Sequence, residues 1–130
     1  YKDGICAMLS AQGHMVLDFG THSLESVDYP DFAHAVAGSV ASGQSDYGIL
    51  LCGSGNGVAM TANKHQQIRC ALCWTEEIAS LARKHNNANI IALPARFVTE
   101  ILAQAMVRVF LTAPFEGGRH EARTVKIACF

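Results

Sequence analysis

Short apolar runs alternate with amphipathic segments along this chain. Apolar runs cover residues 15–20, 47–52, 68–74 and 88–94, and each has the length of a strand. Several of them are apolar throughout, which is typical of strands covered on both faces in a parallel sheet. The segments between them have helical periodicity and helix-ending residues. This alternation predicts an α/β fold, with one domain over residues 1–130.

The predicted helices have recognisable ends. A helix over residues 1–14 stops at Gly13, and Pro30 suits the first turn of the next. Thr75 is a candidate N-cap for a helix that reaches His85. The remaining helices are predicted from the glycine-rich loop to about Lys64, over residues 97–113, and from about Glu121.

Residues 97–113 are predicted to form a long amphipathic helix, with Val98, Leu102, Ala105 and Val109 along one stripe. Residues 21–30 are predicted to form a polar loop. The chain begins directly in a helix without methionine, so we expect another strand upstream of Tyr1. In open parallel sheets, ligands bind beyond the C-terminal ends of the strands.

The amino-acid composition and net charge argue against some classes of binding partner. Half of the residues are hydrophobic, 16% are charged and the net charge is -1. This balance suits a folded core and gives no general attraction to nucleic acid or to an anionic membrane. No apolar run approaches the roughly 18–20 residues of a membrane span. We therefore expect neither a nucleic-acid nor a membrane partner.

The five cysteines are an odd number, which does not suit a disulfide framework. We therefore expect a reducing, cytoplasmic setting. Cys70 and Cys73 form a C-x-x-C, but residues three apart on a strand point to opposite faces. The alternative of a redox pair predicts a reversible disulfide that thiol titration would detect.

The stretch "LLCGSGNGVAM" joins a predicted strand to a predicted helix. Gly53, Gly55 and Gly57 allow a tight turn that exposes backbone N–H groups, which suits an anion. The spacing matches neither the nucleotide P-loop nor the dinucleotide fingerprint. A tight turn without a ligand is the alternative.

Cys52 ends the strand beside this loop. A helix N-terminus favours the ionised form of a nearby thiol, which can then act as a nucleophile or a base. A buried structural cysteine is the alternative, and position alone leaves both open. No cluster of histidine and cysteine has the spacing of a metal site.

Two further segments carry candidate partners for the thiol. His85 and Asn86 lead into a strand rather than follow one, so they are candidates for a site on a neighbouring subunit. His85 also continues an apolar stripe, as a histidine at the edge of the core would. Arg119 and Arg123 are four residues apart on a predicted helix and suit a phosphate or carboxylate, or form a solvated basic face.

Together, "DYP", "GILLCGSGNGVAMTANK", "IRCALCW", "RKHNNANIIAL" and "EGGRHEAR" resemble the ribose-5-phosphate isomerase B family, which includes galactose-6-phosphate isomerase subunits. The resemblance implies a Rossmann-like three-layer α/β/α sandwich with a parallel sheet. It implies a homodimer or homotetramer with active sites built from two subunits, and neither a metal nor an organic cofactor. The implied reaction interconverts ribose 5-phosphate and ribulose 5-phosphate in the pentose phosphate pathway.

The resemblance also implies roles for individual residues. The implied catalytic residues are Cys52 as the base, Ser54 as an aid to proton transfer and His85 as the acid that opens the sugar ring. The implied ligands are Gly53, Gly55, Asn56 and Gly57 as the anion hole, Asn86 for the sugar, Arg119, Arg123 and His120 for the phosphate, and Tyr29 as a site wall.

The chain departs from the family pattern in two places. The branch with a glutamate base carries it just after the glycine loop, where this chain has Val58, so Cys52 is the better candidate. Family members begin with a strand that ends in an Asp-His pair, which we expect upstream of Tyr1.

Two other functions remain open at this point. One is a hexose-phosphate isomerase subunit acting on galactose 6-phosphate or allose 6-phosphate. The other is a non-catalytic module that binds sugar phosphates and does not need Cys52.

Overall fold

The sheet is parallel and its central strand is β3. The computed structural model describes residues 1–20 and 28–129, and within these ranges the sheet has three strands in the order β1-β3-β2. They are β1 (Gly48–Cys52), β2 (Cys70–Leu72) and β3 (Ile90–Pro94). Every residue of β3 is buried, which fits an apolar strand covered on both faces.

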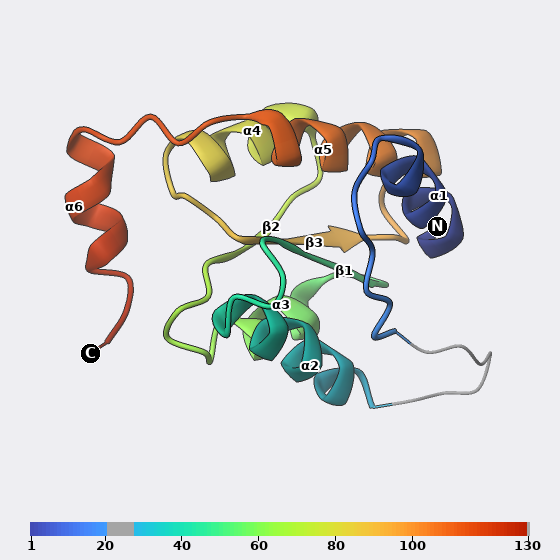
Figure 1. Cartoon of the computed structure of the whole chain (residues 1–130), viewed down its shortest axis with the longest axis horizontal. Helices are drawn as coiled ribbons and strands as arrows, with labels where there is room; N and C mark the ends of the chain where they lie inside the picture. The colour runs from blue at the N-terminus through green and yellow to red at the C-terminus, as the bar shows by residue number, and fades with distance from the viewer. Residues whose placement is uncertain (21–27, 130) are drawn as a thin grey trace.

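Helices cover both faces of the sheet (Figure 1). One face carries α1 (Lys2–Ala11), α4 (Glu76–Lys84) and α5 (Glu100–Thr112), and the other carries α2 (Tyr29–Ala41) and α3 (Asn56–Ala62). The last helix, α6 (Arg119–Val125), stands at one end of the molecule. The predicted three-layer Rossmann-like sandwich is confirmed.

Capping residues set several of the helix boundaries. The Thr75 hydroxyl accepts a hydrogen bond from the amide of Ile78 at 3.1 Å and so caps α4, as predicted. The start of α6 was predicted near Glu121 and lies at Arg119. Residues 21–27 of the predicted polar loop lie outside the described residues, and its last two residues already belong to α2.

The predicted stripe of α5 is confirmed in part, because Leu102 and Val109 are partly buried and pack against the core. Val98 is buried but precedes the helix, because the hydroxyl of Thr99 accepts from the amide of Leu102 and caps it. The fully buried face of the helix is displaced by one residue from the predicted stripe. The stripe that faces the core consists of Ala103, Met106, Val107 and Phe110, which have the i, i+3, i+4, i+7 spacing.

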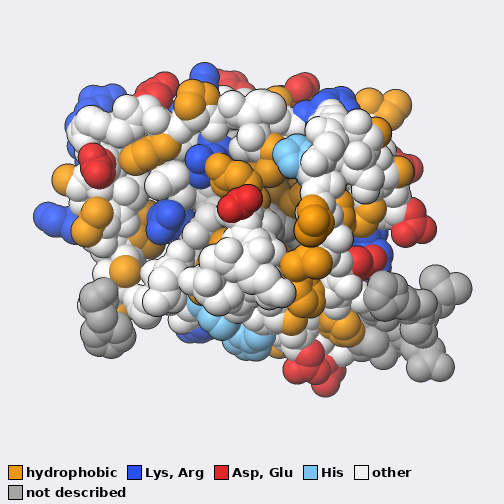
Figure 2. Space-filling model, in the orientation of Figure 1, with side chains coloured by type: hydrophobic (Ala, Val, Ile, Leu, Met, Phe, Trp, Pro, Cys, Tyr) orange, Lys and Arg blue, Asp and Glu red, His pale blue; other side chains and the backbone are white. Residues whose placement is uncertain are grey.

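The strand predicted over residues 15–20 is absent from the structure. Beside this segment runs a groove of about 830 Å³, lined by α1, α2 and β1. Apolar side chains border this part of the surface (Figure 2). A strand requires a neighbouring strand for its hydrogen bonds, and within the described residues the edge of β1 that faces the groove has none. The strand expected upstream of Tyr1 stays a prediction.

The C-x-x-C residues lie on opposite faces of the sheet, as predicted. Cys70 packs against the α2 and α3 side, and Cys73 is buried against the α4 and α5 side. Desolvation by burial raises the pKa of each thiol to about 12. At neutral pH both thiols stay protonated, which disfavours the redox alternative.

The two phenylalanines Phe110 and Phe97 give a matched test of the core. Phe110 is 0% exposed whereas Phe97 is 75% exposed. We expect Phe110→Ala to lower the free energy of unfolding by about 3–5 kcal/mol, because it leaves a cavity. We expect Phe97→Ala to cost less than about 1 kcal/mol. Urea denaturation measures both, and equal losses would contradict this assignment of the core.

Candidate active site

The Cys52 loop is fixed to the segment that follows β3. Cys52 lies opposite Pro94 in the parallel register of β1 and β3. Its carbonyl accepts a hydrogen bond from the amide of Ala95 at 2.9 Å, and the Gly53 carbonyl accepts one from Arg96 at 3.0 Å. The partly buried thiol therefore sits at the C-terminal edge of the sheet, where ligands bind in such folds.

The glycine loop requires its glycines for two different reasons. Gly55 has a φ of 77°, and a β-carbon there would lie 2.6 Å from the side chain of Leu72. A β-carbon on Gly57 would lie about 2.5 Å from the ring of Tyr29. The aromatic ring thus packs directly on the loop backbone, and Tyr29 and Cys52 line the same large groove.

Two polar residues complete the loop. The hydroxyl of Ser54 accepts a hydrogen bond from the amide of Asn56 at 3.3 Å, and both side chains are exposed. Helix α3 begins at Asn56, so its first backbone N–H groups lie next to the loop. The predicted loop residues are therefore brought together with the thiol.

Arg96 is a site candidate that the sequence reasoning missed. A β-carbon on Gly53 would lie 3.1 Å from Nε of Arg96, so this side chain lies over the loop next to Cys52. Arg96 makes none of the ion pairs found among residues 1–20 and 28–129. The available signal was its position two residues after the apolar run that ends at Pro94.

A second group of predicted residues forms around the end of α4. His85 caps this helix, and Asn87 adopts a φ of 48° in the turn that follows. The buried side chain of Arg83 holds the turn through Nη1, which donates to Oδ1 of Asn87 at 2.9 Å and to the carbonyl of Ala88 at 2.6 Å. The position of His85 is thereby set by a buried guanidinium.

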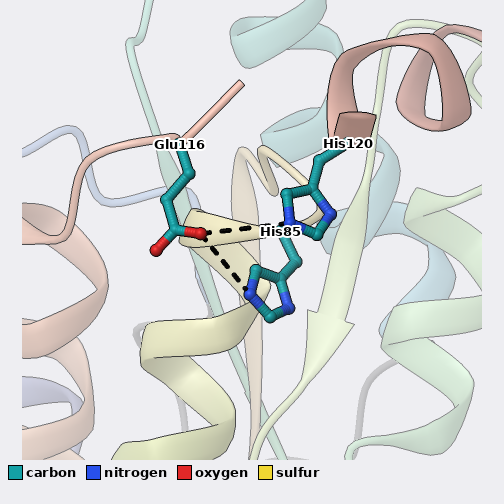
Figure 3. A group of neighbouring side chains, drawn as sticks. All are labelled: His85, Glu116 and His120. Atoms are coloured by element: carbon teal, nitrogen blue, oxygen red, sulfur yellow. Dashed lines mark ion pairs between the residues drawn. The ribbon is translucent and has the colours of Figure 1, made fainter. Parts of the chain in front are cut away.

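His85 and His120 stack against each other, with ring centroids 4.2 Å apart and planes at 13° (Figure 3). Glu116 pairs with both, at 3.6 Å from Nε2 of His85 and 3.9 Å from Nε2 of His120. Desolvation, helped by the positive charges of His85 and Arg119, lowers the pKa of His120. A neutral imidazole is therefore favoured at His120.

The arginine pair lies on α6 beside these histidines. Arg119 begins the helix, Arg123 follows one turn later, and both are exposed. Lys and Arg side chains gather at this end of the molecule in Figure 2. Asn86 is also exposed here, and it lines a hollow of about 300 Å³ with residues 127–129.

The two groups lie at opposite ends of the sheet. Cys52 ends β1, whereas His85 and Asn86 precede the first residue of the parallel neighbour β3. In Figure 1 the arrow of β3 accordingly points away from α6. One chain therefore does not bring the predicted base and the predicted acid together.

The cluster of His85, Glu116 and His120 is a poor fit for a metal ion. Its ligand atoms lie within 4.8 Å of one another. The nearly parallel rings, however, direct their in-plane lone pairs side by side instead of toward one point. Arg119 and Arg123 add positive charge, as their effect on the pKa of His120 indicates. The surroundings favour an anion.

Gly55 gives a test of the loop geometry. We expect Gly55→Ala to destabilise the protein by about 1–3 kcal/mol, because its φ is positive and Leu72 occupies the space. The control is Gly38→Ala inside α2, where no atom lies within 4 Å and alanine should stabilise by about 0.5–1 kcal/mol. Thermal unfolding measures both, and a neutral Gly55→Ala would contradict the described turn.

None of the helices in the described part of the chain has the length and apolarity that crossing a bilayer demands.

Comparison with known proteins gives consistent matches over nearly the whole chain. A family model described as Ribose/Galactose Isomerase matches residues 1–127. The Escherichia coli protein named ribose-5-phosphate isomerase B is 44% identical over 126 residues, which are 97% of this chain and 85% of that protein.

Solved structures agree with these matches. A ribose 5-phosphate isomerase from Thermotoga maritima superposes with a TM-score of 0.95 at 50% identity, covering 98% of this chain and 88% of that one. Ribose-5-phosphate isomerase B from Mycoplasma genitalium, solved with bound ribulose-5-phosphate, has a TM-score of 0.94 at 44% identity, covering 97% and 84%. This chain belongs to the ribose/galactose isomerase family.

Proposed function

We propose that this protein is a cofactor-independent aldose–ketose isomerase that interconverts ribose 5-phosphate and ribulose 5-phosphate. The observation that carries the proposal is the thiol of Cys52 at the C-terminal edge of the sheet, beside the glycine loop. A relative with 44% identity over 97% of this chain was solved with bound ribulose-5-phosphate, which supports the choice of a pentose.

Isomerisation moves one proton between neighbouring carbons and needs no external oxidant or reductant. In the proposed mechanism, Cys52 as thiolate removes the proton from C2 of the open-chain aldose and returns it to C1. The intermediate enediolate carries negative charge on O1 and O2. Backbone N–H groups of the loop are suited to stabilise this charge, and Ser54 to pass a proton between the two oxygens.

Positive charge near the thiol supports the same chemistry. The guanidinium of Arg96 lies over Gly53, next to Cys52. A cation at this position is suited to stabilise the negative charge that develops on the enediolate. We therefore add Arg96 to the proposed catalytic site.

The proposed substrate-binding half comes from a second copy of the chain. His85 donates a proton to open the cyclic sugar, and Asn86 binds a sugar hydroxyl. Arg119 and Arg123 hold the phosphate with the help of His120, since paired guanidinium groups suit a phosphate. The separation of His85 from Cys52 within one chain supports a composite site in a homodimer or homotetramer.

The proposed setting is the cytoplasm. All five cysteines are free, and Cys129 is exposed as a thiol. Free thiols suit a reducing compartment.

Replacing the thiol tests the proposed base. We expect Cys52→Ala to lower kcat for ribose 5-phosphate by about 10²-fold or more, because it removes the proton-transfer group. Calorimetry should show that the sugar phosphate still binds with a Kd within about threefold, since Cys52 contributes little to binding the ground state.

The control is Cys129→Ala, which removes an exposed thiol and should leave both values unchanged. Full activity of Cys52→Ala would reject the thiol base. An inactive parent protein that still binds the sugar phosphate would instead favour the non-catalytic binding module.

Mixed dimers test the composite site. A heterodimer of Cys52→Ala and His85→Ala chains, purified through two different tags, contains one intact site and one doubly defective site. We expect about half of the parent activity per dimer, although each variant alone is nearly inactive.

The control heterodimer pairs Cys52→Ala with a chain carrying both substitutions, and it contains no intact site. Activity no higher than this control would show that each site draws on one chain only.

A further inference from the structure

Glu116 lies where a carboxylate can control the proposed acid. It belongs to the segment between α5 and α6, and its side chain reaches the edges of the stacked rings of His85 and His120 (Figure 3). The ion pairs that these two histidines make within the described residues are both with Glu116. Glu116 takes no part in the proton transfer or phosphate binding proposed for the other site residues.

The backbone fixes Glu116 relative to His85. The amide of Glu116 donates to the carbonyl of Lys84 at 3.0 Å, so the carboxylate is tied to the residue just before His85. The Glu116 side chain is 50% exposed, so solvent reaches the carboxylate beside the two rings. The His120 side chain is only 12% exposed and stacks on the ring of His85.

The stacked histidines lie near positively charged side chains, and Glu116 is the carboxylate that pairs with both of them. Arg119 and Arg123 both act on His120 as positive neighbours, and its pKa is lowered. Of two stacked imidazoles, only one readily carries a proton, because two adjacent cations repel each other. The charges therefore favour a neutral His120. Glu116 lies 3.6 Å from Nε2 of His85, where a carboxylate can act as the counter-ion of a protonated imidazole.

We propose that Glu116 is a positioning residue that pairs with Nε2 of His85 and turns Nδ1 toward the ring oxygen of the sugar. A carboxylate that orients an imidazole and stabilises its protonated form is a recurring catalytic device. This inference rests on the proposed function, because it concerns the ring-opening step alone.

Protonated His85 gives a proton from Nδ1 to the ring oxygen of ribose 5-phosphate, and the bond between that oxygen and C1 breaks. The hydroxyl on C1 loses its proton to water and becomes the aldehyde oxygen. His85 is left neutral, and water reprotonates it after turnover.

The chemistry of the two sugars separates this step from the isomerisation itself. Ribulose 5-phosphate has its carbonyl at C2 and a phosphate on O5, so it cannot close a five-membered ring. Exchange of its C1 proton with deuterium from solvent requires only enediolate formation by Cys52. Conversion of ribose 5-phosphate requires ring opening as well.

The test compares both reactions in the full-length protein carrying Glu116→Gln. We expect kcat for ribose 5-phosphate to fall by about tenfold or more, as a general acid contributes about 10²–10⁴-fold and only part is lost. C1 exchange with saturating ribulose 5-phosphate should stay within about twofold of the parent protein. Glu116→Asp keeps the charge and should recover part of the lost rate.

Glu121→Gln is the matched control, because it removes a nearby exposed carboxylate that makes none of the ion pairs found among the described residues. It should change neither reaction. An unchanged kcat in Glu116→Gln would overturn the inference, and so would an equal loss in both reactions at an unchanged melting temperature. A parent protein that catalyses neither reaction would instead reject the proposed function.

Discussion

The parallel pairing of β1 with β3 constrains every other part of the site. Because the two strands run in the same direction, the residue that ends β1 and the residues that precede β3 must lie at opposite edges of the sheet. Cys52 occupies one edge, and His85 with Asn86 leads to the other. The separation of the predicted site residues into two groups is therefore a property of the topology. The proposed composite site would bring the two groups together across two copies of the chain.

In each of the two groups of site residues, contacts with neighbouring residues fix the position of the functional side chains. On the thiol side, the amides after β3 fix the carbonyls of Cys52 and Gly53, and Tyr29 packs on the loop at Gly57. On the histidine side, the buried guanidinium of Arg83 fixes the turn behind His85. Such support matters because a catalytic group contributes fully only when its geometry is set before the substrate arrives.

Much of this arrangement could be predicted from local signals in the sequence. The cap at Thr75, the thiol at a strand end and the opposite faces of Cys70 and Cys73 all follow from short-range periodicity and chain direction. On α5 the fully buried side chains lie one residue after the predicted stripe, because apolar residues follow one another there and periodicity alone does not show which of them point into the core. Features that depend on tertiary contacts carried little or no local signal: Arg96 over Gly53, the stacking of His85 on His120, and the absence, within the described residues, of a strand paired with residues 15–20.

A crystal structure of the protein with bound ribulose 5-phosphate would show whether Cys52 and His85 of different copies meet at one sugar. We expect C1 and C2 of the sugar to lie about 3–3.5 Å from the thiol of Cys52 in one copy. We also expect the phosphate to contact Arg119 and Arg123 of a second copy, and the sugar to contact His85 of that copy. A sugar phosphate held entirely by residues of one chain, or bound away from Cys52, would contradict the composite site.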